Sequence, residues 1–229
     1  MNSINLRKFL RSRFGGILLI YIVFICISLI SRTVLLSMSF ADVSLNPLNL
    51  LWSYAAGLLM DTVAFSYFMI PFVLFLTFVS DRFFNSKAHK KIAFTVYFIT
   101  FYILIFSGVS EYFFWEEFGV RYNFIAVDYL IYTTEVLGNI KESYPMPTLI
   151  SAMLVADIAL TYFIVKKKFL SVSLESKSIR KQRILSGLAL LSIPVLSFIL
   201  IKNTTVEITK TGTTMSWQKT ASIHCLPLS

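Results

Sequence analysis

Long apolar stretches and shorter polar segments alternate along the chain. The apolar stretches are five in number: Phe14 to Ile30, Thr62 to Ser80, Ile92 to Ser110, Thr148 to Val165 and Ile184 to Ile201. A helix needs about 20 mostly apolar residues to cross the ~30 Å hydrocarbon core of a bilayer, and each run approaches that length. The pattern predicts an all-α, polytopic membrane domain over residues 1–202 with five transmembrane helices, followed by a short tail over residues 203–229.

The first run could also be read as a secretory signal peptide. Four basic residues precede it, namely Arg7, Lys8, Arg11 and Arg13. No small-residue cleavage site directly follows the run, however, and a signal peptide needs one. We therefore expect the first run to remain in the protein as a membrane helix.

Lysine and arginine are distributed unevenly between alternate connections. The N-terminal arm, residues 82–91 and residues 166–183 carry four, four and seven of them, which is 15 in total. The connections on the other side carry three, namely Arg32, Arg121 and Lys141. Because basic residues are retained on the cytoplasmic side, this bias predicts a cytoplasmic N-terminus and an extracytoplasmic segment after Ile201.

The connection between the first two runs is long and partly apolar. It extends from Ser31 to Asp61 and contains five leucine and tryptophan residues between positions 45 and 52. An amphipathic helix along the outer interface would place Trp52 and Tyr54 at the depth of the lipid head groups, where such rings are favoured. An ordinary packed loop is the alternative.

Composition agrees with a membrane protein and argues against nucleic-acid binding. Of the 229 residues, 56% are apolar and 14% are charged, with a net charge of +9. The basic residues occur in short runs between apolar stretches, whereas a nucleic-acid site needs them on one solvated face. The two cysteines, Cys26 and Cys225, are too few and too far apart for a disulfide framework or a metal site.

Two acidic residues fall within or beside the apolar runs. Asp61 precedes the second run and Asp157 lies in the middle of the fourth. Ionisable groups at such depth are costly unless paired or hydrated, so both are candidate functional residues. The alternatives are an interfacial position for Asp61 and a structural hydrogen bond between helices for Asp157. The other three runs contain no acidic residue, which weakens a proton-transport interpretation.

The segment between the third and fourth runs, from Glu111 to Pro145, is both aromatic and acidic. It holds six acids against two bases. If it is helical, Phe124, Val127 and Ile131 share one stripe, so it could lie on the membrane surface as an amphipathic element. Its negative charge opposes attraction to anionic head groups. We therefore expect an aromatic outer-face loop that packs against a specific partner.

Within this segment, the sequence RYNFIAVDYLIYTTEVLGNIKESYP follows the motif EEF. Together with five spans in this order, it resembles the N-terminal membrane domain of lipoteichoic acid synthase-like phosphoglycerol transferases, which belong to the alkaline phosphatase and sulfatase superfamily. The resemblance covers about Arg7 to Lys202. It implies a bacterial plasma (inner) membrane protein that contacts the bilayer and its phospholipid head groups.

In that family, five helices anchor an extracytoplasmic hydrolase-like domain. There a threonine nucleophile and a divalent metal (Mn, Mg or Zn) transfer phosphoglycerol, phosphoethanolamine or a related group from a lipid donor. The resemblance implies that a set of loop residues faces that domain, without a catalytic role for any of them. These residues are Glu116, Glu117, Arg121, Asn123, Asp128, Tyr129, Glu135 and Asn139.

The sequence departs from the family where the catalytic domain ought to begin. Only 28 residues follow Ile201, and they include a single acid, Glu207, and a single histidine, His224. A two-metal site requires several carboxylates and imidazoles, so we expect the chain alone to be inactive. The tail has two interpretations. It is either a disordered extension or a segment translated out of frame. Met215 to Cys225 can be encoded by codons that, when the reading frame starts one base earlier, spell NELAKNGIHSL, and this sequence resembles the family's linker.

Three functional classes follow from these observations. The first is the membrane anchor domain of a sulfatase-like phosphoglycerol or phosphoethanolamine transferase acting on lipid head groups or cell-envelope polymers. The second is a small transporter or lipid-handling protein that uses Asp61 and Asp157. The third is a structural membrane subunit with a separately encoded partner. The sequence leaves the donor, the acceptor and the oligomeric state open.

Overall fold

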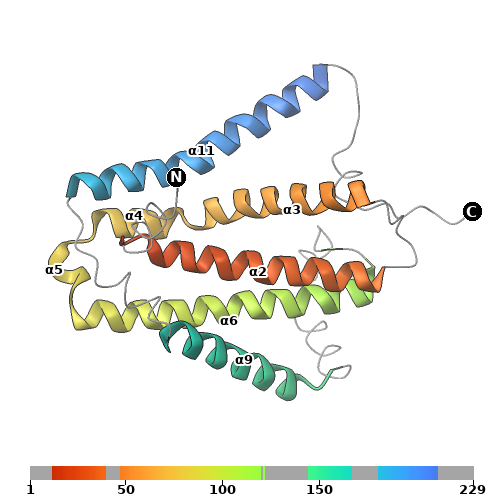
Figure 1. The fold of residues 1–229 in the computed structure, drawn as a ribbon, viewed down its shortest axis with the longest axis horizontal. Helices are drawn as coiled ribbons and strands as arrows, with labels where there is room; N and C mark the ends of the chain where they lie inside the picture. The colour runs from red at the N-terminus through yellow and green to blue at the C-terminus, as the bar shows by residue number, and fades with distance from the viewer. Residues whose placement is uncertain (1–11, 40–46, 120, 122–143, 167–179, 211–229) are drawn as a thin grey trace, which may run out of the picture. The chain divides into compact units, whose positions relative to one another are not determined.

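The structure is a computed structural model, and it describes residues 12–39, 47–119, 121, 144–166 and 180–210 (Figure 1). Nearly all of these residues are helical. The helices are α2 (Gly15–Met38), α3 (Pro47–Phe68), α4 (Ile70–Phe78), α5 (Asp81–Phe84), α6 (Lys87–Phe118), α9 (Met146–Lys166) and α11 (Arg180–Lys210).

Five of these helices are long and apolar enough to cross a membrane. The candidate spans are Gly15–Met38, Pro47–Phe68, Lys87–Phe118, Met146–Val165 and Arg180–Ile199. At most 22% of the most apolar stretch of any span is buried inside the protein, so most of the apolar surface faces outward. Such a surface is stable in lipid and not in water. The all-α fold with five membrane helices is thus confirmed.

The second span is placed differently from the sequence-based expectation. The helix begins at Pro47, and residues 47–61 continue without a break into the run that starts at Thr62. Proline suits the first turn of a helix, because the N–H it lacks has no partner there. Residues 47–61 of the predicted Ser31 to Asp61 connection are therefore neither a separate interfacial helix nor a loop. They belong to α3, and Asp61 lies inside this helix.

A proline also explains why the second run is divided into α3 and α4. The Met69 amide donates to the Phe65 carbonyl over 3.0 Å, and the Val73 amide donates to the Met69 carbonyl over 2.9 Å. Pro71 has no N–H to donate, so the hydrogen-bond ladder is locally interrupted. α3 and α4 act as one bent helix of roughly 48 Å, which exceeds the hydrocarbon thickness of about 30 Å.

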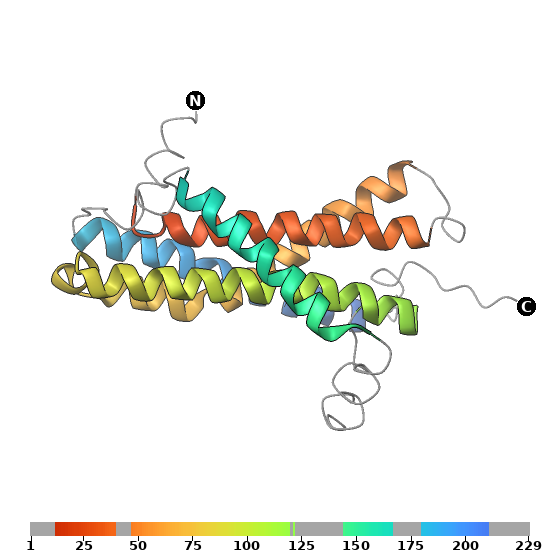
Figure 2. The same cartoon turned by 90° about the horizontal axis from the view of Figure 1, so that it is seen from below.

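The chain divides into two compact units. The first comprises Met1–Ser37 with Phe78–Ile179, and the second comprises Met38–Thr77 with Arg180–Ser229. In the first unit, α9 lies beside α6 and crosses it obliquely, as Figures 1 and 2 both show. In the second unit, α11 packs against α3.

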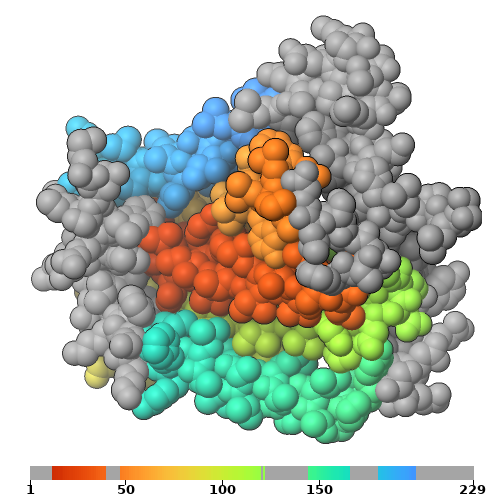
Figure 3. Space-filling view, turned by 45° about the vertical axis from the view of Figure 1, so that its right-hand side comes forward, coloured from red at the N-terminus to blue at the C-terminus, as the bar shows by residue number. Residues whose placement is uncertain are grey.

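Two glycines leave room for side chains between α2 and α6 within the first unit. A Cβ atom on Gly16 would overlap the hydroxyl of Tyr97, and a Cβ atom on Gly108 would lie 3.0 Å from Cγ2 of Ile27. Membrane helices commonly pack through such contacts, because apolar side chains gain nothing by leaving lipid and the fit of side chains against small residues supplies the attraction. Figure 3 shows α2, α6 and α9 lying side by side.

The second unit is held by a proline-containing helix. Pro194 lies inside α11, and its carbonyl oxygen accepts a hydrogen bond of 3.0 Å from the hydroxyl of Tyr67 in α3. Nearby on the same helix, Gly187 has no room for a side chain, because a Cβ atom there would overlap Thr77. These contacts determine how α11 lies on α3 and α4.

Candidate functional site at the end of α6

A left-handed glycine ends α6 and turns the chain back on itself. Gly119 has φ of 64°, and its N–H donates to the carbonyl of Trp115 over 2.8 Å. Side chains other than glycine are strained in this conformation, which is why glycine commonly follows the last turn of a helix. The reversal lets residues after the helix contact its side.

Arg121 uses this reversal to pair with Glu111, ten residues earlier. Its Nε and Nη2 atoms each lie 2.6 Å from Oε1 of Glu111. The Glu111 side chain is 12% exposed and the Arg121 side chain 39% exposed, so the pair is only partly open to water. Charge-assisted hydrogen bonds of this kind are stronger than neutral ones, and they attach the start of the following segment to α6.

Aromatic rings attach the other end of that segment to the same helix. The ring of Tyr144, which precedes α9, lies 4.5 Å from the ring of Phe113, centroid to centroid. Tyr112 contacts Phe113 edge-on at 5.4 Å. Aromatic pairs at such distances add to the stabilisation from burial. Both ends of the segment between α6 and α9 are therefore attached to the last two turns of α6.

The Tyr144 phenol lies within electrostatic range of two acidic side chains, Glu116 and Glu117. Burial raises the pKa of this phenol, and the carboxylates of Glu116 and Glu117 and the ring of Tyr112 raise it further. Glu116 and Glu117 are themselves exposed. The Tyr144 hydroxyl therefore keeps its proton over the physiological pH range and presents a hydrogen-bond donor beside two carboxylates.

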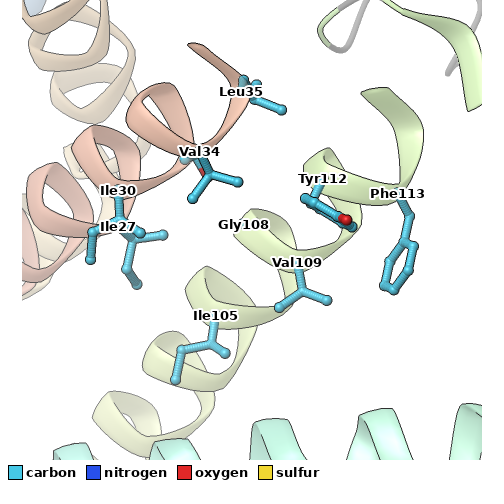
Figure 4. A pocket seen from close by; sticks show the side chains of 10 residues that line it. Ile27, Ile30, Val34, Leu35, Ile105, Gly108, Val109, Tyr112 and Phe113 are labelled. Atoms are coloured by element: carbon cyan, nitrogen blue, oxygen red, sulfur yellow. The ribbon is translucent and has the colours of Figure 1, made fainter. Parts of the chain in front are cut away.

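Beside this cluster, an apolar groove of about 330 Å³ lies between α2 and α6 (Figure 4). Seven of its lining residues offer only hydrocarbon side chains; hydroxyls come from Ser31 and Tyr112, and Gly108 contributes bare backbone. α2 supplies Ile27, Ile30, Ser31, Val34 and Leu35, and α6 supplies Ile105, Gly108, Val109, Tyr112 and Phe113. Sites of this size and chemistry take apolar ligands.

The sequence-predicted site residues divide into two groups. Glu116 and Glu117 lie on the last turn of α6, and Arg121 follows the helix. Asn123, Asp128, Tyr129, Glu135 and Asn139 lie outside the described residues, as do Phe124, Val127 and Ile131. Sequence reasoning did not list Glu111 or Tyr144 as site residues. No local pattern identifies their partners, because Arg121 reaches Glu111 through the chain reversal at Gly119 and Tyr144 lies 31 residues after Phe113.

The two intramembrane acids occupy different environments. Asp61 is half-buried in α3, while Asp157 in α9 is 0% exposed. The hydroxyl of Thr161, one turn further along, is 3.5 Å from Oδ1 of Asp157, which is long for a hydrogen bond. Oδ2 has no hydrogen-bond partner in the part of the chain that is described. The interhelical hydrogen bond considered for Asp157 is thus not seen among these residues.

A second polar cluster lies at the opposite end of α6, and no sequence pattern predicted it. The Arg13 guanidinium pairs with the Asp81 carboxylate, donates to the Val79 carbonyl over 3.3 Å and lies 4.0 Å above the Phe84 ring. The ring of His89 contacts the same phenylalanine at 4.8 Å. Arg13 is only 2% exposed, so it belongs to the packed end of the first unit and not to a solvated basic arm.

Metal-binding groups do not gather within the described ranges. No three His, Cys, Asp or Glu side chains lie close enough there to hold a metal ion. In comparisons with known proteins, no family model matches the chain, and neither the curated proteins nor the solved structures provide a match.

Proposed function

We propose that this chain is the membrane anchor domain of a sulfatase-like phosphoglycerol or phosphoethanolamine transferase that acts on membrane lipid head groups or envelope polymers. The observation that carries the proposal is the Glu111–Arg121 pair. Arg121 is the first residue of the segment whose sequence resembles the family motif. The pair attaches this residue to the helical domain. The Phe113–Tyr144 contact attaches the last part of the same segment.

In this proposal, the segment between α6 and α9 is a docking surface for an extracytoplasmic hydrolase-like domain. Aromatic rings supply contact area at low entropic cost, and charged groups determine orientation. Trp115 and the Tyr144 ring, with the exposed carboxylates of Glu116 and Glu117, provide both kinds of group. The positive-inside bias supports an orientation in the bacterial plasma membrane with this surface outside and the N-terminus in the cytoplasm.

The divalent metal (Mn, Mg or Zn) that the family uses would supply Lewis-acid activation of the phosphoryl group. The described residues do not fit such an ion. Glu111 is committed to Arg121, and Glu116 and Glu117 are neighbours on an exposed turn without a histidine nearby. The proposed contribution of this chain is therefore anchoring and presentation of the lipid-facing surface, with no catalytic step assigned to its residues.

Hydrogen exchange in nanodiscs tests this role. A purified sulfatase-like extracytoplasmic domain added to the full chain is expected to increase protection over residues 111–145, and Arg121→Gln is expected to reduce that increase. Arg82→Gln is the matched control, because it removes an arginine at the other end of the first unit. Equal protection with and without the added domain would contradict the docking proposal.

The runner-up function is a small transporter or lipid-handling protein that uses Asp61 and Asp157. The complete burial of Asp157, with an oxygen that has no partner among the described residues, favours it. Buried intramembrane carboxylates often mark ion or proton paths. Proteoliposomes that contain a pH-sensitive dye test it: proton flux that Asp157→Asn abolishes would favour the transporter, and absence of flux would argue against it.

A further inference from the structure

The groove between α2 and α6 lies along two helices that make few close backbone contacts with each other. At Gly108, the atoms nearest to a missing Cβ are Cγ2 of Ile27 at 3.0 Å and Oγ of Ser31 at 3.5 Å. These two side chains fill the space beside Gly108, and the groove is lined by residues within 27–35 of α2 and 105–113 of α6. Nine residues of helix give it a length of roughly 13 Å.

The lining offers almost nothing to a polar ligand. None of the ten lining residues is charged, and only Ser31 and Tyr112 carry a hydroxyl. A polar or charged molecule would lose its hydration without gaining enough partners, which costs several kcal/mol or more. An apolar ligand gains dispersion contacts with the aliphatic walls. The chemistry of the groove therefore selects a hydrocarbon.

The volume of the groove limits the shape of that hydrocarbon. An α-helix with its side chains is about 10–12 Å across, so 13 Å of helix occupies roughly 1,000 Å³ or more. The groove holds about 330 Å³. The groove is therefore too small to enclose a helix, whereas a single extended hydrocarbon chain fits inside it.

The two ends of the groove differ in polarity. At one end, Tyr112 lies next in sequence to Glu111, which pairs with Arg121, and the exposed carboxylates follow one turn later. Beyond the other end, α2 and α6 come into close contact where Gly16 meets Tyr97. A ligand with one polar end therefore has a single favourable orientation, with the polar end toward Tyr112.

We propose that this groove binds one acyl chain of a membrane phospholipid, with the ester end near Tyr112 and the methyl end near Ile27 and Ile105. The inference does not depend on the proposed transferase role, because lipid binding can occur without any catalytic domain. The groove would hold a lipid in a defined position beside the segment that follows α6, in contrast to the mobile lipids around the other helices.

Photolabelling of the full chain in nanodiscs tests the proposal. The probe is a phospholipid with a diazirine at the end of one acyl chain, and mass spectrometry locates the labelled residues. We expect labelling at Ile27 and Ile105 to exceed labelling at other lipid-facing sites about tenfold, and a diazirine near the ester to shift the label to Tyr112. Even labelling of all lipid-facing residues would show annular lipid only and overturn the proposal.

Two isoleucines of α2 provide a matched pair of variants. Ile30 lines the groove and is 63% exposed, and Ile22 does not line it and is 48% exposed. Ile30→Trp fills the groove and is expected to reduce the specific label about tenfold, whereas Ile22→Trp leaves it unchanged. Val34→Phe, at another lining position, serves as a second groove variant if Ile30→Trp does not fold. Equal effects of the groove variants and Ile22→Trp would contradict the assignment.

Probes with different head groups distinguish recognition of the acyl chain from recognition of the head group. The lining carries no charge, so phosphatidylethanolamine and phosphatidylglycerol probes with the same acyl chain are expected to label the groove equally. Labelling by only one of them would overturn the acyl-chain proposal in favour of a head-group site. The proposal would also be overturned if Ile30 were cross-linked to residues 122–143 or to a second copy of the protein and carried no lipid label.

Discussion

The hydroxyl of Tyr67 donates a hydrogen bond of 3.0 Å to the carbonyl oxygen of Pro194, 127 residues later in the chain. Ser197 donates to the same oxygen over 2.9 Å. Pro194 has no N–H to donate to the Leu190 carbonyl one turn earlier, so the hydrogen-bond ladder of α11 is interrupted beside this contact. This contact joins α3 to α11 within the second unit.

Tyr67→Phe is expected to destabilise the protein by about 0.5–1.5 kcal/mol, because it removes one hydrogen bond between membrane helices and retains the ring. Thermal unfolding in detergent measures the effect. Tyr102→Phe is the matched control: Tyr102 is half-buried on α6. A loss of stability as large in the control as in Tyr67→Phe would refute the importance of the contact.

Gly16→Ala is expected to destabilise the first unit by about 1–3 kcal/mol, because the added methyl group overlaps the Tyr97 hydroxyl and forces α2 and α6 apart. Tyr97→Phe in the same chain removes the overlapping oxygen and is expected to restore part of the loss. Melting temperatures of the single and double variants form the test, and additive losses would contradict direct contact between the two positions.

Replacing Arg121 by glutamine, or Glu111 by glutamine, is expected to release the start of the segment that follows α6. The pair is partly exposed, so the coupling energy from a double-mutant cycle should be only about 1 kcal/mol. The exchange Glu111→Arg with Arg121→Glu should recover part of it. Zero coupling between the two positions would show that the pair does not hold the segment.

Asp157→Leu is expected to leave thermal stability unchanged or to raise it by about 1–3 kcal/mol. The native carboxyl is fully buried with one oxygen that lacks a partner among the described residues, and an apolar side chain of similar volume removes that cost. Asp157→Ala leaves a cavity and should be less stable than Asp157→Leu. A strongly destabilised Asp157→Leu variant would indicate that Asp157 has a structural partner.

Reporter fusions test the proposed orientation. A reporter active only outside the cytoplasm should work when fused after Ile201 and fail when fused after Lys168. The connections on the predicted cytoplasmic side carry 15 lysine and arginine residues, against three on the other side, and basic residues are retained in the cytoplasm. The reverse pattern would contradict the five-span orientation.

The apolar runs alone were sufficient to predict the number and type of the membrane helices. In lipid, each backbone N–H and C=O group must be satisfied within the protein, so an apolar run of about 20 residues has little choice except a helix. The run from Thr62 to Ser80 shows the limit of this reasoning. Its helix begins at Pro47, because helix formation also includes the less apolar residues 47–61, which hydropathy alone assigned to a connection.

Contacts between distant residues were decided only by the tertiary structure. The buried position of Arg13 beside Asp81, the pairing of Arg121 with Glu111 and the groove at Gly108 each depend on how helices pack or where the chain reverses. Helix packing in membranes is driven by close fit between small and large side chains, which no periodicity in one helix reveals. The sequence thus determined which segments form membrane helices, and packing determined which of their side chains meet.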